Sequence, residues 1–330
     1  MSNSRVKIDI PLDVDGKHVG YARLPHSVHR SAYGWLPIPI VSIRNGMGRT
    51  VLVMAGTHGD EYEGRIAASR LIQSIDPTSV QGQIIILPMA NFPAAKEGLR
   101  VSPLDGGNLN RTFPGDAQGS ITSVIAHFIT TELVARADVV LDLHSGGTSL
   151  NYLPSTVSLA GDAPELLEKS KDLMQVFGAP YGILHEGRGG TGSSHDAAVQ
   201  AGAIRIGTEF GGKGYADPGL RQLCEEGVRR TLSYLGVLRG ECFAPAGPVQ
   251  FVRVPPSAYV YADATGLFES QVALGTKVKA GDLAGWTYFP EEPLRPPQAA
   301  RFQIDGIVIC ERSMAPCEIG DCLFHLGVPV

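Results

Sequence analysis

The pattern of apolar and polar positions divides the 330-residue chain into two regions that meet near Gly240. Before Gly240, short apolar runs typical of buried strands alternate with stretches in which apolar residues recur at helical spacing. After Gly240, short apolar runs are separated by frequent Gly and Pro, and no helical period is sustained. The pattern therefore predicts an α/β domain over residues 1–240 and an all-β domain over residues 241–330.

The first region predicts the strands and helices of a mixed sheet. After a loosely alternating stretch over residues 1–45, the expected strands are 51–55, 83–89, 139–143, 182–184 and 203–210. The expected helices are 61–75, 120–137, 163–178, a helix that the glycine-rich segment 187–194 opens and that ends near 201, and 218–238. Strand, helix, strand at this spacing is typical of a parallel crossover, so we expect a sheet sandwiched by helices. Residues 91–115 show no period, and an ordered loop of this length is usually functional.

The second region resembles a lipoyl/biotinyl-type barrel-sandwich. Residues 266–285 are similar to one half of such a domain and residues 306–323 to the other. A carrier domain of this type would hold its modified lysine in the hairpin between the halves, but Lys279 is the last lysine of the chain. We therefore expect a packing or gating role rather than a swinging arm.

Charge and composition exclude several classes of partner. The chain has 28 basic and 33 acidic residues and a net charge of −5, which favours neither a nucleic acid nor an anionic membrane. Its first residues lack the apolar core of a signal peptide, and no apolar stretch approaches the ~20 residues that span a bilayer. Its five cysteines are odd in number and form no Cys-x-x-Cys pair, so reduced thiols and a cytoplasmic location are expected.

The turn after the first buried strand carries candidate metal ligands. Residues 56–61 read Gly-Thr-His-Gly-Asp-Glu and lead into a predicted helix. His58 and Glu61 are three residues apart, a spacing that lets both side chains face one cation. Alternatively, Glu61 is only an acidic residue in a first helical turn, where the helix dipole favours it.

A second histidine follows another predicted strand. Ligands gather at the carboxyl ends of strands in α/β sheets, so His144 and His58 are expected to meet in space. With Glu61 they make a His₂Glu set, which suits Zn²⁺ and leaves a fourth position open for water. Asp142 lies two residues before His144, on the same strand face, and is expected to orient it. The alternatives are a buried structural histidine and a polar residue in a turn at the strand end.

Other polar residues supply the remaining chemistry. Glu209, at the end of another predicted strand, is the candidate base that takes a proton from water, and an ion pair with Arg205 is its alternative role. An oxyanion can be stabilised by a guanidinium and a substrate carboxylate can be held by a bidentate arginine, so Arg100 and Arg111 are candidates for these roles. Asn110 adds amide donors beside Arg111.

Four motifs carry a resemblance to a known family. In chain order they are His58-Gly-Asp-Glu61, Asn108-Leu-Asn-Arg-Thr-Phe113, Asp142-Leu-His144 and Thr208-Glu209-Phe-Gly. In this order and spacing they resemble the succinylglutamate desuccinylase/aspartoacylase family, whose members are relatives of the zinc carboxypeptidases. The resemblance covers about residues 45–240, and the trailing β region fits it as well.

The resemblance implies a role for each matched residue. The zinc ligands would be His58, Glu61 and His144. Glu209 would act first as the general base and then as the general acid to the leaving amine. Two further roles follow from the loop: Asn110 and Arg111 would bind the α-carboxylate of the substrate, and Arg100 matches the family's oxyanion arginine with a longer spacer before the Asn-Leu-Asn-Arg motif.

The substrate is the least defined part of the prediction. The segment at residues 102–107 (SPLDGG) is most like the subgroup of N-α-acetyl-L-2,4-diaminobutyrate deacetylases of ectoine breakdown. Aspartoacylases place a Tyr and an Arg upstream of the base, whereas residues 192–198 here read GSSHDAA, so N-acetylaspartate is not favoured. Asp196 could favour a cationic substrate side chain, and Ser194 and His195 are further candidate pocket residues. For Ser193, Ser194 and His195 the alternative is plain helix capping.

Together these features predict a zinc-dependent amidohydrolase that cleaves a small N-acyl amino acid into a carboxylate and a free amine. On the family resemblance we expect a homo-oligomer. Two alternatives remain open at this point: a carboxypeptidase that acts on short peptides, and a non-catalytic metal-holding binding module.

Overall fold

The computed structural model describes residues 4–159, 164–186, 192–241, 243 and 247–330. Its helices are α1 (Glu63–Ser74), α2 (Phe92–Glu97), α3 (Ile121–Phe128), α4 (Pro164–Phe177), α5 (Ser194–Gln200) and α6 (Pro218–Tyr234). The strands up to residue 212 are β1 (Lys7–Ile8), β2 (Gly16–Pro25), β3 (Trp35–Asn45), β4 (Thr50–Ala55), β5 (Gly82–Leu87), β6 (Val139–Leu143), β7 (Leu150–Leu159), β8 (Tyr181–His185) and β9 (Ile204–Gly212). The later strands are β10 (Gln250–Val254), β11 (Tyr259–Tyr261), β12 (Gly266–Ser270), β13 (Lys277–Val278), β14 (Leu283–Tyr288), β15 (Gln298–Arg301), β16 (Gly306–Arg312), β17 (Pro316–Cys317) and β18 (Cys322–Pro329).

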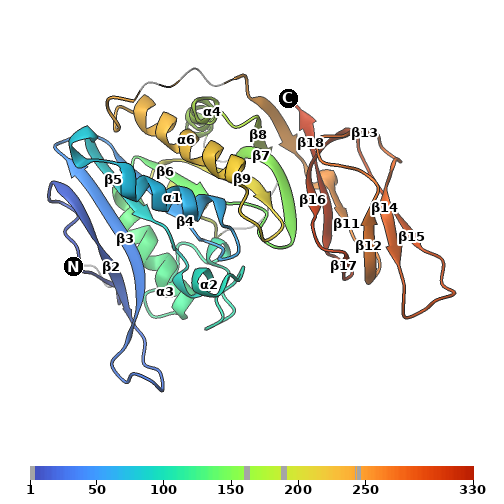
Figure 1. Ribbon diagram of the computed structural model, residues 1–330, viewed down its shortest axis with the longest axis horizontal. Helices are drawn as coiled ribbons and strands as arrows, with labels where there is room; N and C mark the ends of the chain where they lie inside the picture. Colours follow the sequence, from blue (N-terminus) through green and yellow to red (C-terminus); the bar gives the residue numbers. More distant parts are fainter. Residues whose placement is uncertain (1–3, 160–163, 187–191, 242, 244–246) are drawn as a thin grey trace.

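A mixed sheet runs through most of the molecule in the order β1-β2-β3-β5-β4-β6-β9-β7-β8-β10-β18-β16-β13, with β11 paired to β18 (Figure 1). Its centre is parallel, because β5, β4, β6 and β9 run in one direction. A smaller sheet of order β15-β14-β12-β17 lies at the C-terminal end. The predicted mixed α/β fold is therefore confirmed.

Helices cover both faces of the central sheet, and the side-chain pattern of β4 shows why. Val51, Val53 and Ala55 point into the apolar layer beneath α1, α4 and α6. Leu52 and Met54 point into the opposite layer, which contains α3 and α5 (Figure 1). A strand buried on both faces reads as a continuous apolar run, which is the pattern that predicted this element.

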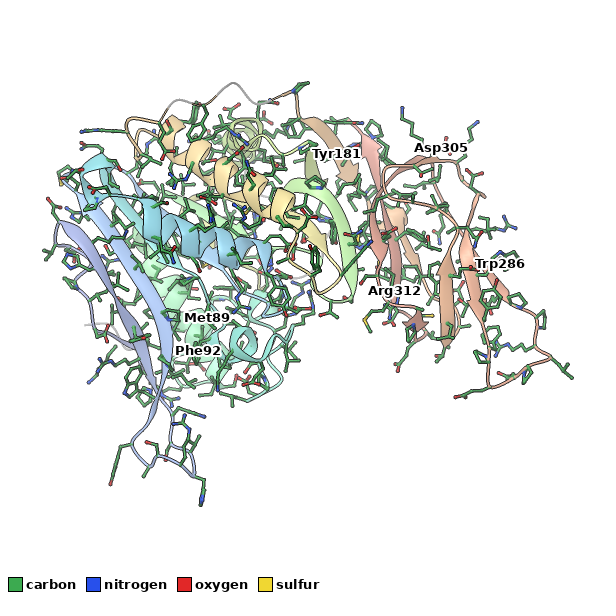
Figure 2. The ribbon with its side chains drawn as sticks, in the orientation of Figure 1. Met89, Phe92, Tyr181, Trp286, Asp305 and Arg312 are labelled. Carbon is green, nitrogen blue, oxygen red and sulfur yellow. The ribbon has the colours of Figure 1, made fainter. Side chains whose placement is uncertain are left out.

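The strands after residue 250 continue this sheet. β10 pairs in parallel with β8, and β16 pairs antiparallel with β7. Figure 2 labels Tyr181 on β8 and Arg312 on β16, which lie at this junction. The apolar core here mixes both regions, since Tyr152, Val157 and Ile183 pack among residues of β10, β16 and β18. Strands from the two sides of residue 240 thus pair within one sheet. The division into two domains stays a prediction.

Most predicted elements are present with ends shifted by a few residues, but three local features differ. The segment 91–115, expected to be an irregular loop, begins with the short helix α2 (Phe92–Glu97). The helix expected over 120–137 ends its α-helical part at Phe128 and continues as a π turn (Ile129–Leu133) and a 3₁₀ turn (Val134–Arg136). β7 was not predicted, because Pro154 interrupts its apolar pattern. The pairing of β7 with β9 is irregular between Tyr152 and Ser155, which accommodates the missing backbone donor of the proline.

Two further points complete the description. Residues 187–191 of the predicted glycine-rich segment lie outside the described residues. Within the described chain, none of the helices has both the length and the apolar character needed to span a bilayer.

Candidate metal centre and active site

Three neighbouring parallel strands place the candidate residues at one edge of the sheet. β6 lies between β4 and β9, with Ala55 opposite Leu143. The turn after β4 carries His58 and Glu61, His144 follows β6, and Glu209 lies on β9. The turn after β4 requires glycine at position 56, whose φ of +70° is strained for other residues and whose Cβ would lie 3.1 Å from the Cα of Met89.

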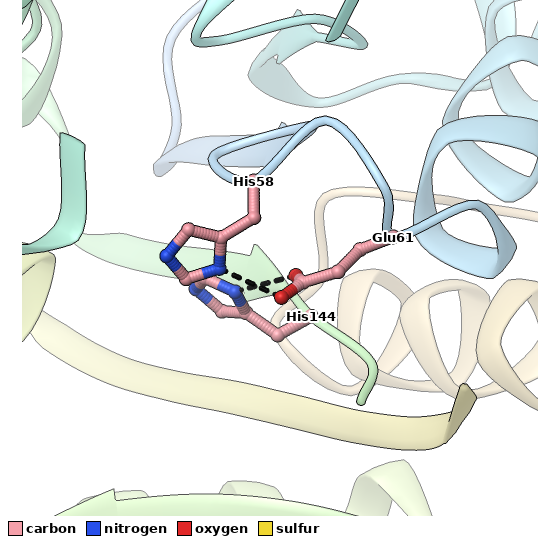
Figure 3. Close-up of side chains that lie close together, drawn as sticks. All are labelled: His58, Glu61 and His144. Atoms are coloured by element: carbon pink, nitrogen blue, oxygen red, sulfur yellow. Dashed lines mark hydrogen bonds and ion pairs between the residues drawn. The ribbon is translucent and has the colours of Figure 1, made fainter. Parts of the chain in front are cut away.

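His58, Glu61 and His144 converge as predicted (Figure 3). Their ligand atoms all lie within 4.8 Å of one another, and all three side chains are buried. The Glu61 carboxylate lies between the two rings, with Oε1 2.7 Å from Nδ1 of His58 and Oε2 2.8 Å from Nδ1 of His144. One carboxylate and two imidazoles at this separation can bind a single divalent cation.

The far nitrogen of each imidazole also has a partner. Nε2 of His144 lies 2.9 Å from Oδ2 of Asp142, as the sequence predicted. Nε2 of His58 lies 3.1 Å from Oδ1 of Asn108. These contacts fix both rings with Nδ1 toward Glu61, which is how outer partners orient metal-binding histidines. Sequence analysis did not assign this role to Asn108, although Asn108 begins the Asn-Leu-Asn-Arg motif.

Asp142 is the centre of a buried polar network. Its carboxylate accepts hydrogen bonds from the Thr57 hydroxyl at 2.9 Å, from Nη2 of Arg205 at 3.1 Å and from the Ser194 hydroxyl. Asp142 is fully buried and Arg205 is 7% exposed, so each charge is desolvated and compensated by the other. Asp142 is therefore a partner of Arg205, the residue that the alternative interpretation paired with Glu209.

The electrostatics of this cluster favour a bound cation. Burial alone would raise the pKa of Glu61, but His58 and His144 lower it to about 2. Burial would likewise raise the pKa of Asp142, yet His144 and Arg205 hold it well below its usual range. For His144, burial opposes protonation, but Asp142 and Glu61 raise its pKa to about 10. Two ionised, buried carboxylates thus surround the imidazoles and stabilise positive charge at this point.

A cavity of about 320 Å³ opens beside His144 and contains several of the predicted residues. Glu209, Asn110 and Arg111 line it together with His144. The amide of Asn110 is fixed from one side, because its Oδ1 accepts a 3.0 Å hydrogen bond from the backbone of Ser194. The structure therefore brings the metal triad, the candidate base and the candidate carboxylate-binding pair together.

The remaining predicted residues are placed in different ways. Nη1 of Arg100 lies 3.7 Å from Oε1 of Glu61, and this side chain is 45% exposed. His195 lines the cavity, whereas Ser194 is fully buried against Asp142. Oδ2 of Asp196 accepts from the backbone of Ser193 and closes a capping box at the start of α5, in agreement with the capping alternative.

Two cavity residues were missed by the sequence interpretation. Tyr152 on β7 and His185 on β8 line the same cavity as Glu209. Neither belongs to a motif, and the strand that carries Tyr152 was not predicted. The only signal in the sequence is the presence of polar rings within otherwise apolar segments, which is too common to assign a role.

Several known proteins are similar to this chain over most of its length. The sequence profile of the succinylglutamate desuccinylase/aspartoacylase catalytic domain matches residues 47–235. An N-alpha-acetyl-L-2,4-diaminobutyric acid deacetylase from Halomonas elongata is 37% identical over 321 residues, which are 97% of this chain and 94% of the relative. The product-bound structure of the ectoine utilization protein EutE (DoeB) from Ruegeria pomeroyi is 33% identical, with a TM-score of 0.95 over 99% of this chain and 100% of that one. A succinylglutamate desuccinylase/aspartoacylase structure from Rhodobacter sphaeroides is 34% identical, with a TM-score of 0.93 over 99% of both chains.

Proposed function

The chain belongs to the succinylglutamate desuccinylase/aspartoacylase family, and from this premise we propose that it is a zinc-dependent amidohydrolase that deacylates a small N-acyl amino acid. The observation that carries the proposal is the cluster of the buried His58, Glu61 and His144, whose His144 lines one cavity together with Glu209 and Arg111. The preferred substrate is N-α-acetyl-2,4-diaminobutyrate, which is supported by the name and the 37% identity of the Halomonas elongata relative.

Zinc fits the donors that the chain provides. Two imidazole nitrogens and one carboxylate, buried and within 4.8 Å of one another, are the donor set of an open catalytic zinc site. When bound, zinc would act as a Lewis acid toward the amide carbonyl and would make a water molecule nucleophilic near neutral pH. Asp142 and Asn108 would hold the two histidines in the orientation that this requires.

The chain's own residues perform the proton transfers and bind the substrate. Glu209 takes a proton from the attacking water, whose oxygen adds to the amide carbon. Arg100 stabilises the negative charge that develops on the carbonyl oxygen. Glu209 then delivers the proton to the amide nitrogen as the carbon–nitrogen bond breaks, which yields a carboxylate and a free amine. Arg111 and Asn110 hold the α-carboxylate throughout.

Replacing the base tests this mechanism. We expect Glu209→Gln to retain zinc and thermal stability but to lower kcat by at least about 100-fold, because the amide cannot accept the proton. The rate is measured on zinc-loaded protein, with metal content determined by elemental analysis. Glu168→Gln, on the exposed face of α4, is the matched control and should turn over at the native rate. A Glu209→Gln variant with near-native kcat would remove Glu209 from the mechanism.

A substrate panel separates the alternatives. N-acetyl-2,4-diaminobutyrate, N-acetylaspartate and short peptides with a free C-terminus are compared by kcat/KM. A preference for the peptides would indicate a carboxypeptidase, and no turnover of any compound by zinc-loaded protein would indicate a metal-holding binding module. Removal of the metal by a chelator should abolish turnover, and added zinc should restore it.

Finer structural assignments belong to the same proposal. We propose that the central sheet is of the zinc-carboxypeptidase type and that residues 241–330 form a barrel-sandwich-like domain. A homo-oligomer is expected from the family resemblance, and sedimentation of the purified protein tests it. The cytoplasmic location expected from the cysteines stays a prediction; Cys242 lies outside the described residues, and the four described cysteines are free thiols.

A further inference from the structure

Two polar residues that line the cavity are in contact with the C-terminal strands. Tyr152 lines the cavity, and its hydroxyl lies 3.1 Å from Nδ1 of His325 on β18. His185 also lines the cavity, and its Nδ1 lies 3.2 Å from the hydroxyl of Tyr259 on β11. Two cavity residues from the first region thus each have a polar partner that follows residue 250.

Strand register explains how these groups meet. Tyr152 lies opposite Cys310, Cys310 opposite His325, and His325 opposite Tyr259, so the four residues form one row across β7, β16, β18 and β11. Residues directly opposite one another share a face of the sheet. Cys310 is small, so the Tyr152 side chain can extend past it to His325. The rings of His325 and Tyr259 are then in edge contact, with centroids 4.3 Å apart.

Three of the four side chains in the two contacts are buried, and Tyr259 is half-buried. His325 is 3% exposed, His185 6% and Tyr152 7%. Burial raises the pKa of the Tyr152 hydroxyl well above its usual value, so the group is a neutral donor and acceptor. Buried polar groups that are fully partnered fix one geometry, because breaking any contact leaves a desolvated group without a partner.

The place of Tyr152 and His185 in the cavity indicates which group of the proposed substrate they contact. In the proposed function, Arg111 and Asn110 hold the α-carboxylate, and His144 with Glu209 faces the amide. The same cavity is also lined by the apolar Val157 and Leu159 and by the polar Tyr152 and His185. The one polar group of an acyl diaminobutyrate that is still to be bound is the amine of its side chain, and a hydroxyl oxygen and an imidazole nitrogen both accept hydrogen bonds from an amine.

We propose that Tyr152 and His185 bind the side-chain amine of the substrate, and that His325 and Tyr259 are positioning residues that hold these two groups in place. The inference rests on the proposed function for the class of substrate. It gives the C-terminal strands a role in choosing the substrate, separate from the hydrolytic chemistry at the metal centre.

Ligand binding to the zinc-loaded protein tests the proposal without requiring turnover. The dissociation constants of L-2,4-diaminobutyrate and of L-2-aminobutyrate, which lacks the side-chain amine, are measured by titration calorimetry. The wild type should bind diaminobutyrate more tightly. His325→Phe and Tyr259→Phe each retain an aromatic ring. Each should weaken the binding of diaminobutyrate by about tenfold, or about 1.4 kcal/mol, and leave the affinity for aminobutyrate unchanged. Tyr288→Phe removes an exposed hydroxyl bonded to Glu269 in the same region and is the matched control.

A double variant separates positioning from a general structural effect. If His325 acts through the Tyr152 hydroxyl, Tyr152→Phe combined with His325→Phe should bind diaminobutyrate no more weakly than Tyr152→Phe alone. The proposal would be overturned if the losses of diaminobutyrate affinity in the two single variants add in the double variant. It would also be overturned if the variants bind both amino acids more weakly by the same factor. A wild type that binds both amino acids equally well would overturn it too, even if it deacylates N-acyl amino acids. A wild type that selects diaminobutyrate but hydrolyses no N-acyl amino acid refutes the proposed function and supports this assignment of the pocket.

Discussion

At the scale of single residues, Asp142 has four polar side-chain partners. It orients His144, compensates the charge of Arg205 and accepts from the hydroxyls of Thr57 and Ser194. Ser194 in turn donates its backbone N–H to Asn110. Ser194 therefore joins Asp142, the proposed partner of a metal ligand, to Asn110, the proposed substrate-binding amide, within one buried network.

Arg205→Met tests the energetic importance of this framework. Removing one partner of a buried ion pair leaves the other charge desolvated, so we expect the free energy of unfolding to fall by about 3 kcal/mol. Urea denaturation measures the change. Arg23→Met breaks a solvent-exposed pair with Asp9, whose arginine is 47% exposed, and is the control. The exposed pair should contribute no more than about 1 kcal/mol, and equal losses in the two variants would contradict the assignment.

Asn108→Ala tests the partner of His58. Loss of the acceptor at Nε2 frees the imidazole to rotate, and we expect zinc affinity to fall by about 10–100-fold, as for other outer partners of metal ligands. Competition with a chromogenic chelator measures the affinity. Asn108→Asp keeps an oxygen in place and should restore most of the binding; if it binds zinc as weakly as the alanine variant, the hydrogen bond is not the cause.

The site residues that could be predicted from the sequence are those near the end of a predicted strand. His58, His144 and Glu209 lie at or just after the end of an apolar run, and Glu61 follows His58 by three residues, so their types and positions were enough to predict a common edge. Asn108 was not assigned because its partner lies 50 residues away along the chain. Tyr152 could not be assigned at all, since only the pairing of distant strands brings it to the cavity.

At the scale of elements, hydrogen bonds from Thr122 to Asp105 connect the loop before α3 to the first turn of that helix. The Asp105 carboxylate accepts from the backbone N–H of Thr122 and from its hydroxyl, both at 2.7 Å. A carboxylate at this position satisfies a free donor of the first turn and interacts favourably with the helix dipole. The loop that ends in Asn108, Asn110 and Arg111 is thereby fixed relative to α3.

Asp105→Asn should loosen this loop. We expect a loss of about 1 kcal/mol in stability at neutral pH, the usual size of a lost helix cap, together with a higher KM. Burial would raise the pKa of Asp105, but the hydrogen bonds from Thr122 lower it. A lowered pKa means that this stabilisation is present above the unfolded value of about 3.9 and is lost as the pH falls through the folded value. The difference in Tm between wild type and variant should therefore shrink below about pH 4, and a constant difference would point to another cause.

Elements were predictable where periodicity was uninterrupted. The strands at the centre of the sheet have continuous apolar runs because helices cover both of their faces. β7 has a proline and several hydroxyl residues, and its pairing is irregular next to Pro154, so its sequence does not show a strand period. The break in the helix after Phe128 is likewise absent from the apolar pattern, which continues through residue 134 while the backbone widens into a π turn.

At the scale of the whole molecule, one sheet connects the candidate metal centre with the C-terminal strands. β8 pairs with β10 and β7 with β16, and one apolar core contains residues from both sides of the junction. We expect a single cooperative unfolding transition, with calorimetric and van't Hoff enthalpies in agreement. Differential scanning calorimetry measures both. Two separate transitions would show that residues 241–330 unfold independently of the rest.

The position of β7 has a consequence for how relatives of this protein can diverge. Tyr152 near its start pairs toward β16, while residues 155–159 pair with β8, so this one strand receives the C-terminal strands and also forms a wall of the cavity. Substitutions after residue 250 can therefore alter that wall without changing His58, Glu61, His144 or Glu209. If the proposed roles hold, substrate range can change during evolution through the C-terminal strands while selection preserves the residues proposed for hydrolysis.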